Sequence, residues 1–80
     1  MVLLRKKEIK DGIVTYYYQP EGKGDWGELY YNSNNGQCGY YFLAGNDDIS
    51  DSKYRNHAYS HLMEFVKKNQ FPEESIRAWG

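Results

Sequence analysis

The sequence predicts a small α+β domain, an antiparallel β-meander of about four strands with one amphipathic helix packed on one face. Two observations lead to this prediction. The first half of the chain consists of short apolar, β-branched and aromatic runs separated by turn sequences, and one long segment with a helical period follows them. A chain of 80 residues is long enough for one core, so we expect residues 1–80 to form a single domain.

The predicted strands alternate with residues that favour turns. Asp11-Gly12 is a strong hairpin signal between two apolar runs, and Asn34-Asn35-Gly36 is a second tight-turn sequence. After the helix, residues 75–79 predict either a short fifth strand or an ordered tail, because Ile76 and Trp79 are costly to leave in water. The four main strands are predicted at residues 2–10, 13–19, 26–32 and 38–44.

The helix is predicted over residues 50–69. Ser50 is a suitable N-cap, and Asn69 can adopt the left-handed conformation that ends a helix before Pro72. At about 100° per residue, one stripe of the helix is apolar, and it consists of Tyr54, Ala58, Leu62 and Phe65. This stripe is expected to pack against the sheet.

Acidic residues gather just before the helix. Asp47, Asp48 and Asp51 follow Gly45, but the spacing departs from that of a calcium loop and no glutamate closes it. Helix capping and turn formation explain these residues better than metal binding.

Composition excludes several classes of protein. Lys and Arg number 10 against 11 Asp and Glu, for a formal charge of −1, so there is no overall attraction to nucleic acid or an anionic membrane. The single cysteine, Cys38, cannot form an internal disulfide, which is consistent with a reducing compartment. The apolar run at residues 1–4 is too short for a leader or a membrane span. We therefore expect a cytoplasmic protein.

Tyrosine is the most distinctive residue of the predicted sheet. Of nine tyrosines, most lie in strands, and adjacent ones point to opposite faces, so one tyrosine-bearing face must lie away from the helix. That face is either solvated, a stacking platform for single-stranded nucleic acid, or a binding surface for a partner protein or a second copy. Because basic residues do not surround the aromatic ones, we expect protein interaction, with a surface formed by Tyr16, Tyr18, Trp26 and Tyr30.

His57, His61 and Glu64 offer an alternative function. The two histidines are four residues apart, so they lie on one side of the predicted helix, and Glu64 follows one turn later. A metal site or a small enzyme could use these side chains, but a metal needs a further ligand, and only the distant Cys38 is a candidate. The simpler interpretation is that they flank the buried stripe, so we expect no enzyme, metal or cofactor.

The layout of strands before a single helix, in which 38–44 is followed by 50–69, resembles that of small bacterial antitoxin and immunity-type proteins. The resemblance implies binding to another protein and involves no shared motif. It therefore supports the interaction hypothesis without naming a partner or a site residue.

Overall fold

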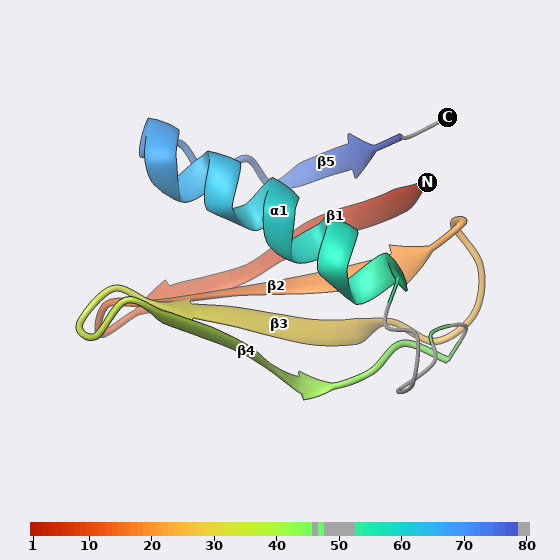
Figure 1. The fold of residues 1–80 in the computed structure, drawn as a ribbon, viewed down its shortest axis with the longest axis horizontal. Coiled ribbons are helices and arrows are strands. Elements are labelled where there is room, and N and C mark those ends of the chain that lie inside the picture. Colours follow the sequence, from red (N-terminus) through yellow and green to blue (C-terminus); the bar gives the residue numbers. More distant parts are fainter. Residues whose placement is uncertain (46, 48–52, 79–80) are drawn as a thin grey trace.

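The computed structural model describes residues 1–45, 47 and 53–78, and within them it forms one antiparallel sheet with a helix on one face (Figure 1). The spatial order of the strands is β4-β3-β2-β1-β5. The predicted α+β fold is confirmed, and of the two alternatives for the C-terminal segment the structure shows the strand, which pairs with the first strand. The elements in chain order are β1 (Val2–Lys10), β2 (Ile13–Pro20), β3 (Gly27–Asn32), β4 (Gln37–Phe42), α1 (Lys53–Lys68) and β5 (Glu74–Arg77).

Two predicted chain reversals are confirmed by their backbone angles. Asp11 and Gly12 join β1 to β2 with φ of 54° and 80°, the pair of positive values that matches the twist of a hairpin. Asn69 has a φ of 53° after the last turn of α1. The amides of Asn69 and Gln70 donate to the carbonyl oxygens of Val66 and Phe65, both at 3.1 Å, which completes a Schellman ending. The expected N-cap, Ser50, lies outside the described residues, as do Asp48, Asp51 and Trp79.

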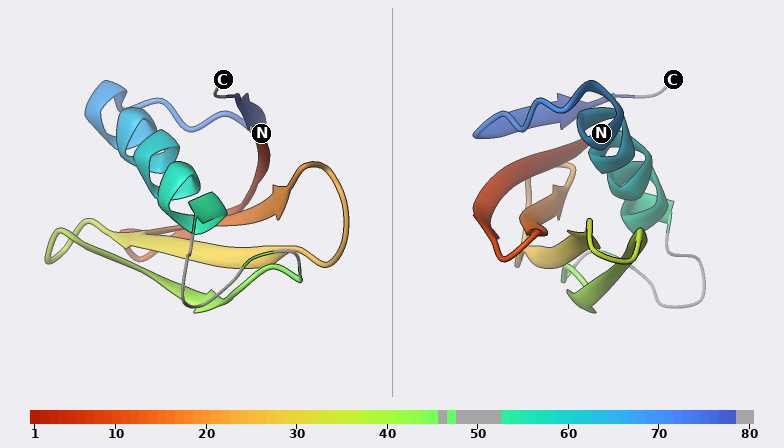
Figure 2. Two further views of the ribbon diagram at one scale, coloured as in Figure 1. Left: turned by 45° about the vertical axis from the view of Figure 1, so that its right-hand side comes forward. Right: turned by 90° about the vertical axis from the view of Figure 1, so that its left-hand side faces the viewer.

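Three of the four residues of the predicted apolar stripe of α1 are buried, and the fourth, Tyr54, is partly buried. Ala58 and Leu62 have no exposed surface and Phe65 retains 7%. The helix crosses β1, β2 and β5 on the inner face of the sheet (Figure 2). It completes a core whose sheet side consists of Val2, Leu4, Val14, Tyr16, Tyr18 and Leu29. Within the described part of the chain, no helix combines the length and the apolar character needed to cross a bilayer.

Two of the tyrosines expected on the interaction surface are core residues instead. Tyr16 and Tyr18 are 0% exposed, so placing them on an open face was wrong. They share the inner face of β2 with Val14, and in the register with β3 they lie opposite Leu29 and Gly27. A Cβ at Gly27 would collide with the Tyr18 ring. The glycine therefore makes room for the tyrosine under the helix.

The buried hydroxyls both have partners, as buried polar groups require. Tyr16 donates to the carbonyl oxygen of Pro72 at 2.6 Å, and Tyr18 donates to Asp47 at 2.7 Å. Burial raises the pKa of Tyr16 to about 12 and raises the pKa of Tyr18 further. Asp47 also accepts from the backbone amide of Arg55 in the first turn of α1, at 3.1 Å. The expected capping role is thus confirmed for Asp47.

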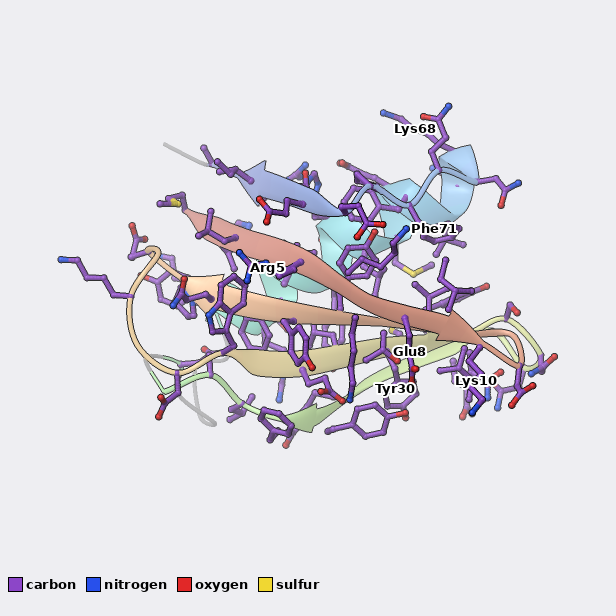
Figure 3. All side chains as sticks on the ribbon, turned by 180° about the vertical axis from the view of Figure 1, so that it is seen from behind. Arg5, Glu8, Lys10, Tyr30, Lys68 and Phe71 are labelled. Carbon is purple, nitrogen blue, oxygen red and sulfur yellow. The ribbon has the colours of Figure 1, made fainter. Side chains whose placement is uncertain are left out.

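The outer face of the sheet is covered by its own long side chains. Seen from that side, Arg5, Glu8 and Tyr30 project from the strands (Figure 3). The guanidinium of Arg5 lies 5.1 Å from the Trp26 ring centre. The Lys7 ammonium contacts a buried carboxylate, that of Glu28, at 3.1 Å. The same ammonium lies 5.7 Å from the Tyr17 ring centre, so on this face Trp26 and Tyr17 are each approached by a cation.

Candidate functional site

Among the described residues, the aromatic side chains that are more than one-third exposed lie on β4, at one edge of the sheet. Tyr40, Tyr41 and Phe42 are 38%, 54% and 49% exposed, and they follow one another in the chain. Among the described residues β4 pairs only with β3, so its outer edge carries free backbone donors and acceptors. We call these three residues and the free edge of β4 the β4 surface.

A bulge spreads the three aromatic side chains around the edge. Leu29 lies opposite Tyr40 while Glu28 lies opposite Phe42, so Tyr41 is the extra residue of β4. Tyr41 lies against Tyr30 on the outer face, with ring centres 4.9 Å apart. The β4 surface therefore continues onto the outer face through Tyr30.

Gly39 makes this continuation possible. It lies opposite Tyr30 in the register of β3 and β4. A Cβ at Gly39 would come within 2.6 Å of the Tyr30 hydroxyl, which is closer than packed atoms approach. Without a side chain at this position, the Tyr30 ring can lie across β4 towards Tyr41.

On the inner side of the edge, Tyr40 meets the start of α1. The Arg55 guanidinium lies 4.5 Å from the Tyr40 ring centre and 6.0 Å from that of Tyr59, within the range of a cation–π contact. Within the described part of the chain, Nε of Arg55 is buried without a hydrogen-bond partner. Arg55 thus fixes Tyr40 against the helix while the rest of that ring stays exposed.

The predicted interaction residues are divided between the two faces. Trp26 and Tyr30 are half-buried near or on the outer face, whereas Tyr16 and Tyr18 lie under the helix. Tyr41 and Phe42, the most exposed aromatic residues in the part of the chain that the structure describes, were not singled out from the sequence. The available signal was the uncharged run 37–42, which lacks the lysine or proline that usually protects an edge strand.

The alternative site at the histidines takes a different form from the one expected. His61 and Glu64 do meet, with Nδ1 and Oε2 3.2 Å apart, but the other contacts come from β5. Nε2 of His61 lies 2.6 Å from the Ser75 hydroxyl oxygen, and Arg77 donates to Glu64 at 2.8 Å. We call His61, Glu64, Ser75 and Arg77 the α1–β5 cluster, in which the predicted His57 takes no part.

Charge holds this cluster together. The hydrogen bond from Arg77, followed by the one from His61, lowers the pKa of the Glu64 carboxyl, although burial opposes the shift. The His61 side chain is only 13% exposed, with its ring centre 4.7 Å from that of Phe65. Among the described residues, no three His, Cys, Asp or Glu side chains are grouped as metal ligands. The cluster links α1 to β5 through the contacts His61–Ser75 and Glu64–Arg77.

Comparison with known proteins yields no family for this chain. It matches no protein-family model, and no curated protein or solved structure is significantly similar to it. Function must therefore be argued from the β4 surface and the α1–β5 cluster themselves.

Proposed function

We propose that the protein is a protein-interaction module that binds through the β4 surface, and that its partner there is a second copy of the same chain. The observation that carries the proposal is the run of exposed aromatic residues Tyr40, Tyr41 and Phe42 on a sheet edge. Aromatic residues are enriched at binding hot spots, and a free edge can gain main-chain hydrogen bonds from another strand.

The composition of β4 supports strand pairing. Its sequence from Gln37 to Phe42 contains neither charge nor proline, and these are the usual protections against pairing. The bulge at Tyr41 leaves residues 37–40 as the regular part of the edge. The aromatic residues that follow would then pack beside the new strand on both of its faces.

A second copy fits this edge by charge. Antiparallel pairing of β4 with itself places uncharged residues opposite one another, so no like charges meet at the centre of the interface. The formal charge of −1 adds little repulsion between whole chains. A domain of this size also buries a small fraction of its surface, so association adds a useful amount of buried area.

The test is the solution mass as a function of concentration. Over about 1 μM to about 1 mM, a range suited to weak self-association, light scattering should show the mass rise from 9.4 kDa towards twice that value. The substitution Tyr41→Lys should keep the chain monomeric, because it places a charge at the centre of the β4 surface.

The matched control is Ile76→Lys on β5, the opposite edge. Ile76 is 64% exposed, against 54% for Tyr41, so both substitutions replace an exposed apolar side chain on an edge strand. The control should dimerise as the unmodified chain does. A mass of 9.4 kDa at every concentration, or equal weakening by both substitutions, would overturn the proposal.

A further inference from the structure

The α1–β5 cluster contains a hydroxyl, an imidazole and a carboxylate in sequence. Ser75 Oγ lies 2.6 Å from Nε2 of His61, and the other ring nitrogen, Nδ1, lies 3.2 Å from Glu64 Oε2. Serine nucleophiles of enzymes are activated by this same order of groups, with the imidazole as general base and the carboxylate as its orienting partner.

The carboxylate sets the direction of the hydrogen bonds. With its pKa lowered by Arg77 and His61, Glu64 is ionised at neutral pH and can only accept. Nδ1 of a neutral His61 must then carry the proton and donate to Glu64. Nε2 is left as an acceptor, so the Ser75 hydroxyl donates to it. This is the tautomer in which the imidazole can remove a proton from serine.

Rigid elements hold the three groups. His61 is on α1 and its ring packs against Phe65, while Ser75 lies in the ladder of β5 opposite Leu4 on β1. Arg77, two residues further along β5, holds the second oxygen of Glu64 at 2.8 Å. The α1–β5 cluster is therefore held by a helix and a strand rather than by loops, as a preorganised site requires.

The register of β5 also provides a donor for an oxyanion. The Lys6 amide donates to the Glu73 carbonyl at 2.8 Å, so this directly opposed pair is a hydrogen-bonded one. Hydrogen-bonded and non-hydrogen-bonded pairs alternate in an antiparallel ladder. Leu4 and Ser75 are then hydrogen-bonded, and the amide of Ile76 points to the free edge of β5. This N–H directly follows the serine and is available to a developing oxyanion.

We propose that Ser75 is a nucleophile that accepts the acyl group of small, uncharged carboxylic esters. Its Oγ attacks the carbonyl carbon while His61 Nε2 takes the hydroxyl proton. As the tetrahedral intermediate collapses, the bond to the leaving oxygen breaks and His61 returns the proton to it, releasing the alcohol. Water then attacks the acyl-serine with the same proton transfers, releasing the acid and restoring Ser75.

A groove runs along the same end of β5. It is lined by Ser75 with Leu3, Leu4, Trp26 and Ile76, and by Arg5 and Glu74, whose side chains form an ion pair at 3.2 Å. Because side chains alternate between the two faces of a strand, Glu74 and Ile76 lie on the face opposite the Ser75 hydroxyl, and an ester would reach both around the edge of β5. The two charges of the groove pair with each other and the rest of the lining is largely apolar, so the groove favours uncharged substrates over ionised ones.

The test is covalent labelling of the intact chain with a fluorophosphonate, followed by peptide mass spectrometry. The label is expected on Ser75 of the folded chain and not on the chain unfolded in urea. His61→Gln retains a hydrogen-bonding side chain but cannot act as a base, so labelling should slow about 100-fold or more. Acetate release from 4-nitrophenyl acetate should fall in parallel.

Ser60→Ala provides the matched control. Ser60 is an exposed serine on α1 outside the cluster, and its loss should leave both the labelling and the esterase rate unchanged. Circular dichroism of each variant separates loss of the nucleophile from loss of the fold. A folded wild-type chain that carries no label on Ser75, or that labels Ser75 no faster than the unfolded chain does, would overturn the proposal.

Discussion

The two edges of the sheet are built in opposite ways. At one edge, β5 is short, carries Glu74 and Arg77, and is held to the helix by the Ser75–His61 and Arg77–Glu64 contacts. At the other edge, β4 is uncharged and its last three residues are 38–54% exposed aromatic side chains. The side chains of β5 are tied to the helix by a hydrogen bond and an ion pair, whereas on β4 Tyr40 meets the helix through a cation–π contact with Arg55 and Tyr41 and Phe42 stay exposed.

The two edges also differ in how much of their apolar surface is buried. The polar side chains of β5, those of Glu74, Ser75 and Arg77, are engaged within the chain, and the strand adjoins the buried core around Leu62 and Phe65. The exposed side chains of the β4 edge contribute little to that core, so their apolar surface is unnecessary for folding. This exposed aromatic run is the reason we propose that β4 contacts another molecule.

The largest expected difference between the two regions is in core stability. Leu62→Ala removes a fully buried side chain of α1 and should lower the free energy of unfolding by about 2–5 kcal/mol. Tyr41→Ala should change it by less than about 0.5 kcal/mol when the chain is monomeric, because Tyr41 is 54% exposed. Urea unfolding at low protein concentration measures both. Equal losses of unfolding free energy in the two variants would contradict the distinction between the core and the β4 surface.

A smaller effect is expected from a single hydroxyl. The Tyr16 hydroxyl donates to the carbonyl of Pro72, just before β5, at 2.6 Å. Tyr16→Phe should therefore cost about 0.5–1.5 kcal/mol, measured by thermal or urea unfolding. Tyr41→Phe is the matched control on the β4 surface and should be neutral. A neutral Tyr16→Phe would show that this bond does not stabilise the β5 side.

The smallest effect is the response of the β5 edge to acid. Arg77 and His61 lower the native pKa of Glu64 below its ordinary value of 4.5, so the carboxylate stabilises the fold above pH 4.5. This stabilisation is lost as the pH falls through the lowered native pKa. Between about pH 5 and pH 3, Glu64→Gln should lose less stability than the unmodified chain. Identical acid melts would contradict the role given to this pair.

Local sequence signals predicted most of the fold. Asp11-Gly12 and Asn69 adopt the left-handed angles that their residue types favour, and Ala58 and Leu62 follow the helical period into the core. These features depend on neighbours in the chain. The pairing of β5 with β1 depends on contacts between the two ends of the chain, so the sequence left a strand and an ordered tail as alternatives for residues 75–79.

The site was harder to predict because both faces of β2 carry similar residues. Tyr16 is buried and Tyr17 is only partly buried because the helix covers one face of β2. Nothing in the sequence of β2 itself decides which of its two faces the helix covers. The edge position of β4 likewise follows from the pairing of β5 with the opposite side of the sheet. In the α1–β5 cluster, helical spacing predicted that His61 and Glu64 meet, but not that Ser75 and Arg77 join them.

The most direct test of the difference between the edges is amide hydrogen exchange at two protein concentrations. If copies pair through β4, exchange of the amides in Gln37–Phe42 slows as concentration rises, while exchange in Glu74–Arg77 stays constant. The β5 amides are an internal control within the same sample. Exchange in β4 that is independent of concentration, or equal slowing in both strands, would contradict the assignment of β4 as the interaction edge.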